Sequence, residues 1–146
     1  MKLPRILIAS AALLGALFFS GCASVTKQAT NVFPDPKPDK GLVYFYRESK
    51  FVGGAVSYNI REKGNEQIIG AIANGTYFFH FADPGAHIYV ASTEADASRS
   101  IQVEAGKTYY LECGVEMGIF AGRPSMKIAN EAEAKSVLPT LHYATK

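Results

Sequence analysis

The stretch QIIGAIANGTYFFHFADPGAHIYVAS, residues 67–92, decides the fold. It contains three runs of apolar and aromatic residues, which are separated by Asn-Gly at 74–75 and by Asp-Pro-Gly at 83–85. Asn-Gly accepts positive φ at both central positions of a tight turn, and Asp, Pro and Gly all favour turns. The stretch therefore predicts consecutive β-strands that are joined by a hairpin at each of these turns.

Further strand patterns lie on both sides of this stretch. They are residues 42–47 (LVYFYR), 56–60 (VSYNI), 100–105 (SIQVEA) and 108–117 (TYYLECGVEM). These runs are rich in β-branched and aromatic residues or alternate between apolar and polar positions, as strands do. Turn residues rather than helices connect them. We therefore predict a mainly β fold, an antiparallel β-sandwich of about six to eight strands.

The pattern changes near the end of the chain. Asn130 is a good N-cap residue, and Glu133 follows it at the spacing of a capping box. Residues 132–138 favour a helix until Pro139 ends it. We expect one short C-terminal helix.

The first 21 residues have the pattern of a signal peptide. Lys2 and Arg5 precede the apolar run 6–19, and no acidic residue accompanies them. The run is too short to span a bilayer comfortably as a helix. Positive charge, a short apolar run and then small residues are typical of a secretory signal.

Phe19-Ser20-Gly21-Cys22 resembles the lipobox of bacterial lipoproteins, in which a large apolar residue and two small ones precede a cysteine. Phe19 stands where Leu is usual. The resemblance implies cleavage between Gly21 and Cys22, a diacylglyceryl thioether on Cys22 and acylation of its new amino group. Several acyl chains would hold the protein on a membrane far longer than one. An ordinary signal peptide with an incidental cysteine is the open alternative.

The residues after the cysteine bear on location and reach. Ala23 stands where Asp would be the inner-membrane retention signal, so the resemblance implies an outer-membrane location facing the periplasm. Pro34, Pro36 and Pro38 alternate with charged residues, which predicts a semi-rigid spacer reaching on the order of 50 Å. We expect a signal peptide at 1–21, the lipidated cysteine and proline-rich linker at 22–40, and one domain at 41–146.

Charge and cysteine content restrict the class of function. Loss of Lys2 and Arg5 with the signal peptide leaves thirteen of the fifteen basic residues against thirteen acidic ones. This balance argues against a nucleic-acid surface, which gains affinity from net positive charge. With Cys22 lipidated, Cys113 has no partner for an intramolecular disulfide, and its apolar neighbours in period two predict a core position.

The order of the strand motifs resembles the DUF2846 family of bacterial lipoprotein domains. The resemblance covers residues 41–141, and its most recognisable parts are NGTY at 74–77, DPGAH at 83–87 and AGKTYYL at 105–111. It implies a small Ig-like or prealbumin-like sandwich and an envelope location. It implies no chemistry, because the activity of the family is unknown, but such modules usually bind or space rather than catalyse.

Two histidines are weak candidates for a metal site. In a hairpin that is symmetric about the turn at 83–85, His80 would face His87 on the neighbouring strand. Zinc needs at least three protein ligands, and no further ligand lies at an evident spacing. We therefore expect no metal and no cofactor apart from the covalent lipid on Cys22.

Aromatic residues are the candidates for partner binding. A sandwich core cannot take both faces of every tyrosine-rich strand, so some rings are expected to face outward and form a flat surface. The candidates are Tyr44, Tyr46 and Tyr110, together with Phe120 in the segment 118–126. A rim of amphipathic side chains around the core is the open alternative.

Two classes of function follow. The first is a non-catalytic binding or structural module of the cell envelope, attached to the membrane by its lipid and contacting another envelope protein or peptidoglycan. The second is a periplasmic hydrolase or metal-binding enzyme with an unrecognised site. No serine lies in a glycine-flanked elbow and no glycine-rich phosphate loop is present in the sequence, which favours the first class.

Overall fold

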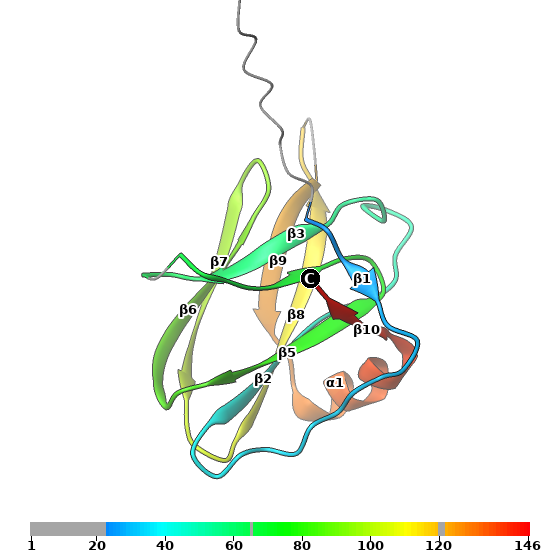
Figure 1. The fold of residues 1–146 in the computed structure, drawn as a ribbon. Helices are drawn as coiled ribbons and strands as arrows, with labels where there is room; N and C mark the ends of the chain where they lie inside the picture. Colours follow the sequence, from blue (N-terminus) through cyan, green and yellow to red (C-terminus); the bar gives the residue numbers. More distant parts are fainter. Residues whose placement is uncertain (1–22, 65, 120–121) are drawn as a thin grey trace, which may run out of the picture.

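The protein folds as two β-sheets packed face to face (Figure 1). The computed structural model describes residues 23–64, 66–119 and 122–146. Within these ranges the six strands of the larger sheet are, in spatial order, β1 (Thr26–Lys27), β10 (His142–Thr145), β5 (Thr76–Ala82), β2 (Gly41–Arg47), β8 (Thr108–Met117) and β9 (Gly122–Ile128). The four strands of the smaller sheet are β4 (Ile68–Ile72), β3 (Tyr58–Glu62), β6 (Gly85–Ser92) and β7 (Asp96–Val103). This arrangement confirms the predicted β-sandwich.

Most neighbouring strands are antiparallel, as predicted, but β2 pairs with β8 and β5 with β10 in parallel. Parallel neighbours need a long connection, and the chain forms the whole smaller sheet between β2 and β8. The carboxyl ends of β2 and β8 therefore lie at the same end of the sandwich. β8 continues beyond β2, because Tyr46 near the end of β2 pairs with Glu112 in the middle of β8.

The two predicted hairpins are wrong, because the chain changes sheets at both turns. β4 pairs with β3, β5 pairs with β2 and β10, and β6 pairs with β3 and β7. Gly75 and Gly85 do have positive φ, 71° and 141° respectively, as turn residues should. A turn reverses the chain without choosing the neighbour of the next strand. In the larger sheet, β5 has a hydrogen-bonded partner on each side, β2 and β10.

The main core lies between the two sheets. The ring of Phe45 stacks on Phe78 at 4.8 Å between centroids and meets Tyr89 of the opposite sheet edge-on at 5.0 Å. Cys113 is buried in this core, which confirms its predicted position. Burial raises the pKa of the Cys113 thiol to about 12, so the thiol stays protonated and unreactive at neutral pH.

A short helical segment covers part of the outer face of the larger sheet. It consists of α1 (Glu131–Val137) and the 3₁₀ helix η1 (Leu138–Thr140). The backbone N–H of Glu133 donates to Asn130 Oδ1 at 2.8 Å, which confirms the predicted N-cap and helix. A second buried cluster forms beneath this segment from Leu42, Tyr44, Tyr46, Tyr77, Tyr110, Ala134, Leu138 and Leu141. None of the helices in the described ranges is long and apolar enough to cross a membrane.

Three strands lie where the sequence pattern did not indicate any. β1 lies in the expected linker, β9 includes residues 122–126 of the candidate contact segment 118–126, and β10 follows the helix. The sequence did not indicate β9 because Pro124 interrupts its strand pattern. β9 is the last strand of its sheet, and proline is tolerated in such an edge strand. Phe120 lies outside the described residues.

The proline-rich linker is packed against the domain. Both the N–H and the C=O of Val32 hydrogen-bond to the Tyr77 hydroxyl, at 2.9 and 3.0 Å, and the Phe33 ring stacks on Tyr77 at 5.2 Å. The Lys37 ammonium lies 4.2 Å from the centre of the Phe81 ring. Figure 1 shows the segment running down the side of the sandwich to the start of β2. The expected extended spacer is therefore wrong for residues 26–40.

The Tyr77 hydroxyl provides a test of this packing. Replacement of Tyr77 by Phe removes both hydrogen bonds to Val32 and is expected to lower the free energy of unfolding by about 1–2 kcal/mol. Tyr46→Phe is the matched control, because the equally buried Tyr46 hydroxyl has no hydrogen-bond partner among the described residues. It should leave stability unchanged or slightly raised. Urea denaturation measures both, and equal losses would contradict the proposed contribution of the linker.

Candidate functional site

An apolar pocket opens on the outer face of the larger sheet, between the linker and the helical segment. We call it the aromatic pocket, and its volume is about 250 Å³. Its lining residues are Phe33, Tyr44, Tyr110, Lys135, Leu138 and Pro139. They come from the linker, from β2, from β8 and from the helical segment. The pocket therefore exists only when these four parts of the chain are assembled.

Two stacked tyrosines form the floor of the aromatic pocket. Tyr44 and Tyr110 are register partners in the parallel pair β2–β8, and their rings lie 5.6 Å apart with planes inclined by only 7°. Side chains alternate between the two faces of a strand, so Tyr44 points outward while its neighbour Phe45 points into the main core. Phe33 stands at the side of the pocket, half exposed, with its ring against Tyr77.

The pocket is electrically neutral except at its rim. Burial is the main cause that raises the pKa of Tyr44 to about 12, and burial also raises the pKa of Tyr110. Both phenols are therefore protonated at neutral pH. Lys135 at the rim pairs with Glu131 at 2.5 Å, one helical turn away. Both side chains of this pair are well exposed, so the ion pair adds little stability and can rearrange.

The structure brings together only some of the aromatic residues that the sequence suggested. Tyr44 and Tyr110 meet in the pocket, whereas Tyr46 is fully buried beneath the helical segment. The expected flat, exposed face is wrong for all three, because the linker and the helical segment cover it. Phe33 was missed because it lies in a segment interpreted as a spacer, although an aromatic residue just before three alternating prolines could have indicated a docked segment.

The arrangement of His80 and His87 differs from the predicted one. They do not pair across a hairpin, since β5 and β6 belong to different sheets, but both rings lie near the ring of Tyr89. The centroid distances to the Tyr89 ring are 6.4 Å for His80 and 5.9 Å for His87. The predicted register of His80 opposite His87 is therefore wrong.

The ring nitrogens of His87 are both engaged. Nδ1 lies 2.6 Å from Glu62 Oε1, and Nε2 lies 2.7 Å from the backbone oxygen of Asp83. Each ring nitrogen of His87 therefore already has an oxygen atom within hydrogen-bond distance. In ranges 23–64, 66–119 and 122–146, no group of three or more His, Cys, Asp or Glu residues is arranged to hold a metal ion.

A polar groove of about 410 Å³ lies elsewhere, between β7 and the β8–β9 pair. Glu112 and Glu116 line it together with Arg99 and Lys127, and Lys127 Nζ pairs with Glu112 Oε2 at 2.9 Å. Arg99 donates from two nitrogens to the backbone oxygen of Met126, which ties the edges of the two sheets together. Neither His80 nor His87 lines this groove, so the two histidines do not share a site with Glu112 and Glu116.

The environment of His80 predicts a pH-dependent stability. Burial is the main cause that lowers its pKa, assisted by His87 and Lys40 and opposed by Glu62 and Asp83. The unfolded chain therefore takes up a proton at a higher pH than the folded protein does, and stability is lost as the pH falls from about 7 through the folded pKa. We expect His80→Gln to lose less stability than the wild type over this range.

Urea denaturation of both proteins between about pH 7.5 and pH 5 measures this difference. The difference in free energy of unfolding between wild type and His80→Gln should shift in favour of the variant as the pH falls. A difference that stays constant across the range would contradict a protonation effect at His80.

Comparison with known proteins places the domain in a family. The family model described as "Protein of unknown function (DUF2846)" matches residues 37–137, from the docked linker to the end of α1. No curated protein and no solved structure matches the chain. The match spans more than half of the 146 residues and includes β2 through α1. The chain therefore belongs to the DUF2846 family.

Proposed function

We propose that this protein is a lipoprotein of the cell envelope, held on the periplasmic face of the outer membrane through Cys22, whose domain binds another envelope protein without catalysing a reaction. The attachment rests on Phe19-Ser20-Gly21-Cys22 and on the apolar run before it, which lie outside the described residues. The binding role rests on one observation, the aromatic pocket. These two parts of the proposal are independent of each other.

The size of the aromatic pocket favours a protein partner. Its volume of about 250 Å³ lies just below the range of roughly 300–1,000 Å³ that is usual for small-molecule sites. One large side chain of a partner protein fits such a space. Insertion of one apolar or aromatic anchor into a pocket is also how protein interfaces concentrate their binding energy.

The chemistry of the pocket points in the same direction. Tyr44, Tyr110, Phe33 and Leu138 present mainly apolar surface, and the Lys135 ammonium stands at the rim. A peptidoglycan sugar would bring many hydroxyl groups, which need hydrogen-bond partners when they are buried. An aromatic or aliphatic side chain needs none and would stack on the tyrosine floor. We therefore favour a protein over peptidoglycan as the partner.

The lipid attachment can be tested at Cys22. Cys22→Ala should abolish incorporation of a fatty-acid probe and release the protein from the membrane fraction, because the thioether cannot form. Cys113→Ala is the matched control, since it removes the other cysteine, which is buried in the core. This variant should keep both the label and the membrane association. Label that persists in Cys22→Ala would contradict the lipoprotein assignment.

The binding site can be tested by crosslinking in cells. A photo-crosslinking amino acid at Lys135, on the rim of the pocket, should capture a partner that mass spectrometry identifies as an envelope protein. The same amino acid at Ala132, exposed on α1 but outside the pocket lining, is the control. Phe33→Ala should reduce the crosslink from position 135 several-fold, because it removes one wall of the pocket.

Three results would count against this site. Equal capture from positions 132 and 135 would indicate nonspecific contact. A crosslink that Phe33→Ala leaves unchanged would separate the partner from the pocket. Capture of peptidoglycan fragments instead of a protein would show that the partner is peptidoglycan and not another envelope protein.

A further inference from the structure

The chain enters the domain at the end of the sandwich where β2 and β8 finish. The Ser57 hydroxyl donates to the backbone oxygen of Ala23 at 2.9 Å, so the first described residue is held beside the segment that leads into β3. Cys22 directly precedes Ala23, and neighbouring Cα atoms are about 3.8 Å apart. With the linker docked from Thr26 onward, a lipid on Cys22 begins within one residue of the folded domain.

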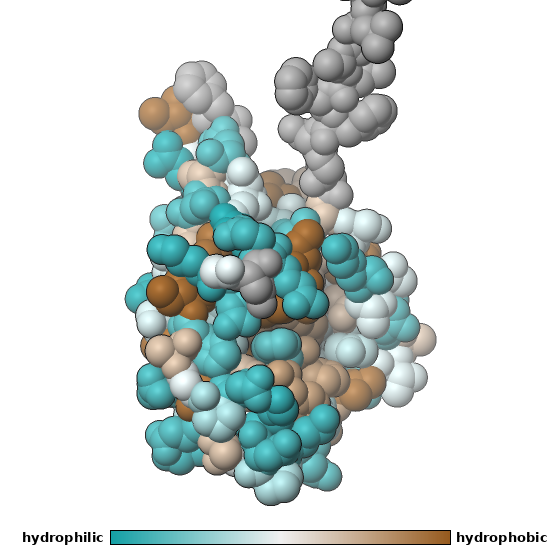
Figure 2. Space-filling model, turned by 60° about the vertical axis from the view of Figure 1, so that its left-hand side comes forward, coloured by the Kyte–Doolittle hydropathy of each residue, from teal (hydrophilic) through white to brown (hydrophobic). Residues whose placement is uncertain are grey.

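Exposed apolar side chains concentrate at this same end. Phe51 and Val52, in the loop after β2, are 102% and 55% exposed, and Met117 and Ile119, at the tip of the β8–β9 hairpin, are 76% and 82% exposed. Among the described large apolar residues, only Ile128 is also more than half exposed. Figure 2 shows hydrophobic side chains at the tip of this hairpin. We call Phe51, Val52, Met117 and Ile119 the apolar tip.

The loop after β2 is anchored on the body of the sandwich, close to the base of the β8–β9 hairpin. A Cβ on Gly53 would lie only 2.8 Å from Val115 Cγ1, which shows how closely the loop after β2 packs against β8. The buried Arg47 guanidinium donates to the backbone oxygens of Gly53 and Val56, both at 2.6 Å. The loop is therefore fastened at its base while Phe51 and Val52 project into solvent. Exposed apolar side chains on a loop that is fixed in place can enter an apolar environment without a rearrangement of the backbone.

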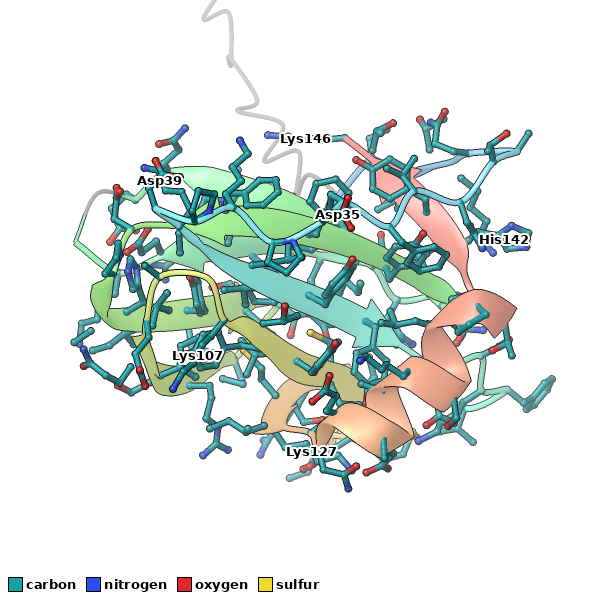
Figure 3. The ribbon with its side chains drawn as sticks, turned by 90° about the horizontal axis from the view of Figure 1, so that it is seen from below. Asp35, Asp39, Lys107, Lys127, His142 and Lys146 are labelled. Atoms are coloured by element: carbon teal, nitrogen blue, oxygen red, sulfur yellow. The ribbon has the colours of Figure 1, made fainter. Side chains whose placement is uncertain are left out.

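We propose that the apolar tip docks into the interface of the phospholipid bilayer that carries the lipid anchor. The proposal rests on the lipidation of Cys22 in the proposed function, because the anchor brings this end of the domain to the membrane. Amphipathic protein surfaces bury their apolar side about 5–10 Å into the boundary between headgroups and acyl chains. Docking would orient the sandwich with the turn at Lys107, labelled in Figure 3, away from the membrane.

Two features favour the bilayer over a partner protein as the occupant. The first is the position of Ala23, which is held by Ser57 in the segment that leads from the loop after β2 into β3, so a lipid on the preceding residue would start at this end of the domain. The second is shape, because the tip consists of projecting loop residues, whereas the aromatic pocket is a concavity on the outer face of the larger sheet. Projecting apolar side chains suit insertion into a fluid interface, while pockets suit side chains of a partner.

The chain contains no tryptophan, so a single introduced tryptophan reports its own environment. Ile119→Trp places the probe in the apolar tip, and Ile128→Trp makes the same change at an exposed position about 20 Å along β9 from the base of the hairpin. Both variants, in the mature form lipidated on Cys22, are reconstituted into vesicles of phosphatidylethanolamine and phosphatidylglycerol, with or without brominated acyl chains. Circular dichroism verifies that both variants are folded.

We expect brominated lipid to quench the fluorescence of Ile119→Trp at least about twofold, with a shift of the emission to shorter wavelength, and to leave the fluorescence of Ile128→Trp unchanged. Adding Phe51→Asp to Ile119→Trp should weaken the quenching, because a carboxylate in the apolar tip opposes its insertion. Adding Ile128→Asp should not.

Vesicle flotation and fatty-acid labelling of the same samples separate the two proposals. If Ile119→Trp is labelled and floats but its fluorescence is not quenched, membrane docking is overturned and the anchor stands. Equal quenching at 119 and 128 also overturns docking by this particular end. A protein that neither floats nor takes up the label contradicts the anchor and, with it, the docking.

Discussion

The central strand β2 imposes the constraint on which the rest of the structure depends. Every residue of β2 is buried, and its apolar side chains point to both faces of the larger sheet. Val43 and Phe45 face the smaller sheet, while Leu42, Tyr44 and Tyr46 face the other way. Two covering layers are therefore needed. The smaller sheet supplies one, and the helical segment with the linker supplies the other.

The second layer links the fold to the proposed function. Because the linker helps to cover the outer face, it cannot act as a free tether, and its first described residue, Ala23, is held beside the segment that leads into β3. The aromatic pocket is the part of the outer face that the linker and the helical segment leave open, with Tyr44 and Tyr110 at its floor. In this arrangement the membrane would contact one end of the sandwich, while a partner would approach the side of the sheet.

How much of the structure could be predicted depends on how far apart in the sequence the interacting residues lie. The N-cap at Asn130 was predictable because its hydrogen bond spans only three residues. The turn at 74–75 was recognised as a turn, but the strands on its two sides joined different sheets. The same limit applies to Tyr44 and Tyr110, which the sequence singled out without indicating that Phe33 and Leu138 would cover them. Contacts across more than a hundred residues, such as Asn31 with Tyr143, leave no local pattern.

Local patterns alone were enough to indicate the strand-rich composition, the terminal helix, the buried Cys113 and the lipobox-like motif ending at Cys22, because each depends on neighbours in the chain. Only the tertiary structure decided that the chain crosses between sheets at 74–75 and 83–85, that the prolines lie on the domain, and which tyrosines form a pocket. The physical reason is that a strand pattern specifies two faces but names no partner for either of them. The segments that pack against each face are determined by the need to bury the outer face of β2. These segments come from distant parts of the chain, so a local pattern does not identify them.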